Sequence, residues 1–253
     1  MNPFFLHPFL ILFSSLCVFW IAARIGAICR ERRGELKDAH RSDLALILGA
    51  TLTLLGLIIG FTFSMALTRY DLRKTYEEAE ANAIGTEYVR LDLLPTNDAE
   101  HARVLLRRYL GLRIAYYGAR DLKTLERINV ETTQLQSELW QAVRRPIAAD
   151  PTPVGALVLS GMNDVLNSQG YTQAAWWNRI PIGAWALLFL ISLFSNLLVG
   201  YAAHGRSFLF LMILPLVLSI SLFLIADIDS PRHGIIRVQP ENLESLLTSL
   251  GPG

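Results

Sequence analysis

The sequence predicts an all-α membrane protein with four transmembrane helices and an α-helical bundle inserted between spans 2 and 3. Of the 253 residues, 52% are hydrophobic and 18% are charged, a mixture typical of apolar spans that alternate with an aqueous part. Four segments are apolar over the ~20 residues that cross a bilayer core. The long segment between the second and the third has apolar residues at helical spacing and no strand-like alternation.

The four apolar segments define the predicted spans. They are Phe4–Ala27, Leu44–Leu67, Pro181–Ala203 and Ser207–Ala226. The first is longer than the usual core of a signal peptide and lacks a basic start, so we expect it to be a retained span. Only His204–Arg206 separates the last two, which are therefore expected to form a membrane hairpin.

The predicted domain organisation follows from these spans. Residues 1–67 hold transmembrane helices 1 and 2, and residues 68–178 form an extramembrane helical domain that continues from span 2. Residues 179–228 hold transmembrane helices 3 and 4, and residues 229–253 form a C-terminal tail. Because Thr68–Lys74 contains neither Gly nor Pro, the helix of span 2 is expected to continue into water.

The inserted domain is predicted to be a bundle of amphipathic helices. In the extension of span 2, the face expected to meet the bundle carries Leu72, Tyr76, Ala79 and Ala83. Asn97 is the expected N-cap of the next helix. A further helix is expected to start near Asp121 and to be stopped by Pro146, Asp150, Pro151 and Pro153. A short amphipathic helix is expected over Asn242–Leu250.

Motifs that carry enzyme chemistry are absent from the sequence, so we predict no enzyme activity, catalytic residue, cofactor or metal site. No two histidines lie three or four residues apart, and no phosphate-binding glycine loop precedes a Lys-Ser or Lys-Thr pair. The net charge of +1 gives no reason to expect nucleic acid as a partner. Glu77, Glu78 and Glu80 have basic residues nearby and are expected on a solvated helix face.

A stripe of small residues on span 2 is the main functional signal. It consists of Gly49, Thr53, Gly56, Gly60 and Ser64, which fall within an arc of roughly 80° at ~100° per residue. Such a stripe either packs closely against another helix in lipid or lines a water-filled path. The sequence leaves both interpretations open.

The register of the same helix favours the second interpretation. Asp71, Lys74 and Glu78 continue the face of the stripe beyond the apolar segment, as a charged vestibule would. Leu57 and Phe63 flank the stripe and are the candidate constriction. Since one copy cannot enclose a path, conduction would require a symmetric homo-oligomer.

Two carboxylates follow span 4, where Asp227 and Asp229 lie beside Arg232. One interpretation is a helix end held by ion pairing and turn hydrogen bonds. The other is a cation site, although two carboxylates are few for Ca²⁺, which takes 6–8 oxygen ligands.

Two motifs make the chain resemble the bacterial bestrophin-like family of membrane proteins. One runs from Gly60–Leu67 through Arg69–Asp71 into Glu78–Thr86, and the other is the tail Ala226–Val238, with Asp227, Asp229, Pro231 and Arg232. The resemblance covers nearly the whole chain from span 2 onward.

The resemblance implies a function and a place in the cell. Bestrophins are pentameric anion channels in which span 2 lines the pore, so it implies a homo-oligomer in the bacterial inner membrane that passes ions, chloride among them. Fold likeness alone does not carry activity, and a non-conducting membrane-anchored scaffold or sensor is the alternative. Bestrophin pores are narrowed by apolar residues four apart, whereas here that spacing belongs to Leu57, Phe61 and Met65, to one side of the stripe. The acidic calcium clasp is reduced to Asp227 and Asp229, so calcium gating is not implied.

The side of the membrane that holds residues 68–178 is left open by the sequence. Basic residues of the first connection place that connection in the cytoplasm and the inserted domain on the far side: Arg30, Arg32, Arg33, Lys37 and Arg41. Other basic residues flank the spans on the side of the insert and nearly cancel this bias: Arg69, Arg73, Lys74, Arg179, Arg232 and Arg237. The bestrophin analogy places the insert in the cytosol.

Overall fold

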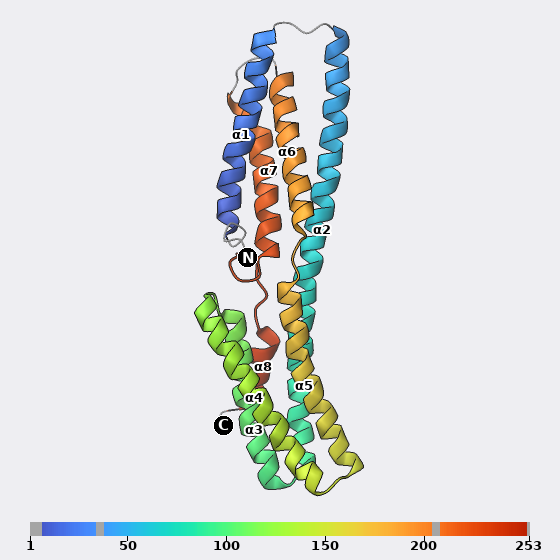
Figure 1. Cartoon of the computed structure of the whole chain (residues 1–253), viewed down its shortest axis with the longest axis vertical. Helices are drawn as coiled ribbons and strands as arrows, with labels where there is room; N and C mark the ends of the chain where they lie inside the picture. The colour runs from blue at the N-terminus through green and yellow to red at the C-terminus, as the bar shows by residue number, and fades with distance from the viewer. Residues whose placement is uncertain (1–6, 34–37, 204–207, 252–253) are drawn as a thin grey trace. The chain divides into compact units, whose positions relative to one another are not determined.

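The computed structural model describes residues 7–33, 38–203 and 208–251, and every regular element in these ranges is a helix (Figure 1). The expected hairpin turn at His204–Arg206 lies outside the described residues. The chain divides into two compact units. The membrane unit comprises residues 1–69 and 179–237, and the helical unit comprises residues 70–178 and 238–253.

The membrane unit confirms the prediction of four spans. Its helices are α1 (Pro8–Arg33), the first part of α2 (Asp38–Arg90), α6 (Ile182–Ala202) and α7 (Phe208–Asp229). Four helices among the described residues are long and apolar enough to cross a membrane. Within this unit α1 packs against both α6 and α7 (Figure 1).

The contact between α1 and α6 depends on two glycines. A Cβ built on Gly200 would overlap the backbone carbonyl of Ala23, and a Cβ built on Gly26 would overlap that of Leu197. The two helix backbones therefore touch, as small residues allow in lipid, where packing rather than the hydrophobic effect holds helices together.

The second helix is continuous, as the sequence predicts. It runs for 53 residues, about 80 Å at 1.5 Å per residue, through the apolar segment and on into the charged sequence. The helical unit contains the rest of α2, η2 (Leu91–Leu93), α3 (Thr96–Gly118), α4 (Leu122–Ala149), α5 (Pro153–Trp177) and α8 (Glu241–Ser249).

Large apolar and aromatic side chains fill the core of the helical unit. Members with little or no exposed surface include Leu106, Tyr109, Leu110, Leu139, Val143, Val158 and Met162. They come from α3, α4 and α5, which confirms a bundle of amphipathic helices.

Helix ends agree with the sequence in part. Asp121 caps α4 as expected, because its side chain accepts a hydrogen bond of 2.8 Å from the Thr124 backbone N–H. The expected cap at Asn97 is wrong, since α3 begins at Thr96 and Pro95 occupies the cap position. The expected end of the following helix is confirmed, since α4 ends just before Asp150, although Pro146 itself does not stop it. The helix α4 continues through Pro146 to Ala149. Because Pro146 has no backbone N–H, one helical hydrogen bond is lost there.

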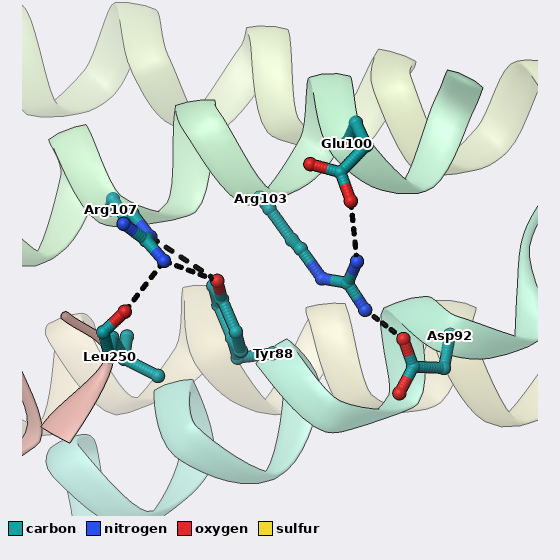
Figure 2. Close-up of polar contacts among 6 residues, drawn as sticks. All are labelled: Tyr88, Asp92, Glu100, Arg103, Arg107 and Leu250. Carbon is teal, nitrogen blue, oxygen red and sulfur yellow. Dashed lines mark hydrogen bonds and ion pairs between the residues drawn. The ribbon is translucent and has the colours of Figure 1, made fainter. Parts of the chain in front are cut away.

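The C-terminal end of α8 is tied to α2 and α3 by an arginine (Figure 2). Arg107 of α3 donates to the Leu250 carbonyl oxygen at 2.7 Å and to the Tyr88 hydroxyl at 2.8 Å. One turn earlier, Arg103 pairs with Asp92 and Glu100 and lies over the Tyr88 ring. The predicted terminal amphipathic helix is thus confirmed and is held against the bundle.

Candidate ion path along α2

The small-residue stripe of span 2 faces nothing within the chain. Apart from the adjacent residues and nearby backbone of α2 itself, no described atom lies within 4 Å of the point where Gly49, Gly56 or Gly60 would carry a Cβ. Thr53 and Ser64 are exposed as well. Only 6% of the most apolar stretch of α2 is buried within the described chain, whereas 33% of the corresponding stretch is buried in α1 and also in α7. Packing within one chain therefore does not account for the stripe.

The part of span 2 that does pack lies on another face. Leu55, Thr62 and Ala66 are buried, and at ~100° per residue they centre roughly 140° away from the stripe. The glycines that bring helices together in this unit are Gly26 and Gly200, which the sequence analysis missed. The neighbouring Ala23 and Ala27 make Gly26 part of a small-residue cluster, and that cluster is the signal that could have identified it.

The candidate constriction residues flank the stripe and are open in the single chain. Leu57 is 54% exposed and Phe63 is 39% exposed. Phe61 and Met65 lie on the same side of the helix as Leu57 and are exposed too. Span 2 thus presents two uncovered faces, one small and one bulky.

Beyond the apolar segment, the three predicted vestibule residues Asp71, Lys74 and Glu78 are exposed. The face predicted to meet the bundle does so only in part. Ala83 packs against the core and Tyr76 stacks on Tyr171 of α5, whereas Leu72 and Ala79 are exposed. The face of α2 that enters the core of the helical unit carries mostly charged residues instead: Arg73, Glu77, Glu80, Ile84 and Glu87.

Glu77 and Glu80 are buried, so the prediction that they lie on a solvated face is also wrong. Glu80 pairs with Arg113 of α3, and both side chains are fully buried. The Thr172 hydroxyl of α5 donates a third contact to the Glu80 carboxylate at 3.0 Å. Burial by itself would lower the pKa of Arg113, but the adjacent carboxylate outweighs it and the pKa is raised. These partners offset the cost of removing the charges from water.

The tail motif is a fold-back held by its carboxylates. Asp227 accepts hydrogen bonds from the backbone N–H groups of Ile235 at 2.7 Å and Ile236 at 2.8 Å. Asp229 accepts one from the backbone N–H of Ile180 at 3.1 Å, just before α6. Turn hydrogen bonds therefore account for Asp227, as the first interpretation expects, whereas Asp229 binds a backbone N–H 49 positions away in the chain.

Other features of the motif serve the same turn. Pro231 is buried and Arg232 half-buried within it. A Cβ on Gly234 would overlap the Asp227 carbonyl oxygen, so the chain can return only with glycine there. Among the residues that the structure describes, no three His, Cys, Asp or Glu side chains are grouped so that they could hold a metal ion.

In a comparison against known protein families, the model of the Bestrophin-like domain matches residues 16–243. The chain belongs to the bestrophin-like family. Membership of this family supports an ion-channel kind of function. The family and the four long apolar helices both indicate a membrane protein. No curated protein matches the chain.

Solved structures similar to this bestrophin-like chain include bacterial bestrophin homologues from Klebsiella pneumoniae. A mutant of that homologue has a TM-score of 0.65 and 15% identity, with 95% of this chain and 99% of that chain covered. The structure phased with zinc has a TM-score of 0.61 and 16% identity, with 94% and 97% covered. At this identity the likeness shows the fold alone.

Proposed function

We propose that this bestrophin-like protein forms a homo-oligomeric ion channel in which span 2 of every copy faces a common axis. The open stripe carries the proposal, because Gly49, Gly56 and Gly60 meet nothing in their own chain although they lie in an apolar helix. Small residues around an axis leave room for an ion path, and symmetric copies are needed to close it.

The second uncovered face of span 2 supports the same assembly. Leu57, Phe61 and Met65 are bulky and exposed next to the stripe, where a neighbouring copy would cover them. Leu57 and Phe63 would then stand at either side of the stripe and narrow the path. The number of copies, five by analogy with bestrophins, is part of the proposal.

The ions are proposed from two different supports. The bestrophin resemblance favours anions, with chloride the first to test. The charges of the vestibule instead favour cations in that part of the path, because Asp71, Glu78 and Lys74 together carry a net charge of −1 per copy. If these carboxylates face the path, Asp71→Asn combined with Glu78→Gln raises chloride permeation relative to potassium. The reversal potential under a salt gradient measures this ratio.

Flux through liposomes tests conduction itself. Purified protein is first shown to be oligomeric by its mass in solution, and chloride and potassium fluxes are then measured after reconstitution. Gly60→Leu is expected to reduce flux, because its side chain would enter the path. Gly183→Leu on α6 is the matched control, since that glycine also has open space in front of it. No flux from a verified oligomer, or equal flux from both variants, would contradict the channel.

Thiol labelling separates the channel from the scaffold or sensor. Cys17 and Cys29 are free and exposed, so both are first changed to Ser. Single cysteines at Thr53, Gly60 and Ser64 are then treated with a water-soluble reagent. Labelling at all three supports a wet path, whereas uniform protection supports packing without conduction.

The inner membrane of a bacterium is the proposed location, with several spans and the helical unit in the cytosol by analogy. Reporter fusions within residues 119–121, between α3 and α4, measure the side directly. A reporter that is active only outside the cytoplasm would overturn this placement and support the charge of the first connection instead.

A further inference from the structure

Three carboxylates of α2 are buried in the helical unit, and one of them lacks partners. Glu77 is bonded to α8, and Glu80 is bonded to Arg113 and Thr172. Glu87 is 0% exposed, yet neither of its carboxylate oxygens has a hydrogen-bond partner in the part of the chain that the structure describes. A buried ionised carboxylate without donors is costly, so this position favours a neutral group.

The site around Glu87 is formed by the contact between α2 and α5. A Cβ on Gly161 of α5 would overlap the Glu87 carboxylate and the Arg90 guanidinium, so the carboxyl group lies against bare backbone. Two charged groups face it, Arg90 from α2 and Asp164 from α5. The pKa of Glu87 is raised from its ordinary 4.5 to about 8, and burial is the largest cause. Arg90 opposes this shift, and the Asp164 charge adds to it.

The two halves of α5 are attached to α2 in different ways. The C-terminal half is tied by polar contacts, since Arg73 donates to the carbonyl oxygens of Ala175 and Asn178 and Thr172 donates to Glu80. The N-terminal half buries the apolar side chains of Val158 and Met162 and meets the carboxyl group of Glu87.

We propose that Glu87 is a proton-binding site through which pH controls the packing of the N-terminal half of α5 on α2. With the proton bound, the neutral carboxyl group stays between the helices. When the proton is released to solvent, the carboxylate requires water, and the N-terminal half of α5 separates from α2 to admit it. The C-terminal half stays attached through Arg73 and Glu80. The proposal does not depend on conduction.

The direction of the pH effect follows from proton linkage. The packed state holds the proton more tightly than the open state does, so packing is fully favoured at pH values below the ordinary carboxyl pKa. It weakens as the pH rises from 4.5 to about 8. Removing the charge of Asp164 moves the midpoint to lower pH, and removing that of Arg90 moves it to higher pH.

Hydrogen exchange of the full chain in detergent tests the site, with each rate corrected for the intrinsic pH dependence of exchange. Peptides from residues 153–165 are expected to lose protection as the pH rises, while peptides from residues 170–177 keep it. Glu87→Gln is expected to abolish the step and to retain protection at high pH. Glu78→Gln, an exposed carboxylate on the same helix, is the control and leaves the step unchanged.

A uniform response along α5, or a step that persists in Glu87→Gln, would overturn the proposal. Asp164→Asn provides a second measurement that keeps the native Glu87 in place. Its midpoint is expected at lower pH than that of the unmodified protein, and an unchanged midpoint would overturn the assignment to Glu87.

Discussion

The Glu77 carboxylate of α2 holds Asn242 at the start of α8 with two hydrogen bonds. It accepts one from the Asn242 backbone N–H at 2.9 Å and one from the side-chain Nδ2 at 2.6 Å. The Leu243 N–H donates a third at 3.0 Å. The cap position of α8 is Pro240, which provides no side-chain hydrogen bond. A carboxylate from another helix therefore caps α8 and also places a negative charge at its positive end.

Glu77→Gln is expected to weaken the docking of α8. The variant loses one acceptor oxygen and the charge, so the cost is about 1–2 kcal/mol. Faster proteolysis or hydrogen exchange over residues 238–250 measures it. Glu78→Gln, one position along and exposed, should change stability by less than ~0.5 kcal/mol. Equal effects from the two variants would contradict the role of Glu77.

The buried pair of Glu80 and Arg113 predicts a non-additive result. Arg113→Ala leaves a buried carboxylate without its main partner and should cost about 3–5 kcal/mol. Replacing both residues together, as Glu80→Leu with Arg113→Met, should cost less, because no charge remains uncompensated. Unfolding followed by tryptophan fluorescence, to which the buried Trp176 of the same core contributes, measures both. A double variant as unstable as the single one would disprove this account.

The backbone contact at Gly200 makes a prediction for the membrane unit. Gly200→Ala places a methyl group against the Ala23 carbonyl and should destabilise the packing of α1 on α6 by about 1–3 kcal/mol. Thermal unfolding in detergent reports the loss. Gly183→Ala on the same helix meets open space and should be neutral or slightly stabilising. Similar midpoints for the two variants would exclude the close contact.

The hydrogen bonds of Asp227 predict that this carboxylate stabilises the fold and that the stabilisation does not depend on calcium. Asp227→Ala removes the acceptor of two backbone N–H groups and should cost on the order of 3 kcal/mol. Because these groups already occupy both oxygens, Ca²⁺ should leave the thermal midpoint of the unmodified protein unchanged relative to chelator. A calcium-dependent rise that disappears in Asp227→Ala would show a metal site instead.

Features set by local sequence were predictable. The helix of span 2 continues past Leu67 because no residue there breaks it, and Asp121 caps α4 because its side chain reaches a backbone group three residues away. The grouping of small residues into one stripe on span 2 followed from helical periodicity, whereas its exposure in the single chain did not.

Features set by distant partners were not predictable in the same way. Glu77 and Glu80 have the sequence of a solvated face, and their burial depends on Asn242, 165 positions away, and on Arg113, 33 positions away. The contact of Gly200 with α1 likewise joins segments far apart in the chain. A charge run therefore indicates exposure only when no later segment supplies its counter-groups.

The bond between Glu77 and Asn242 also orders events during synthesis. Residues 70–90 of α2 leave the ribosome long before α8, so the Glu77 carboxylate is made well before the backbone groups that it caps. Since α8 follows α6 and α7 in the chain, α8 can dock on α2 only after both of these helices have been made. A docked α8 therefore shows that synthesis of α6 and α7 is complete in that molecule.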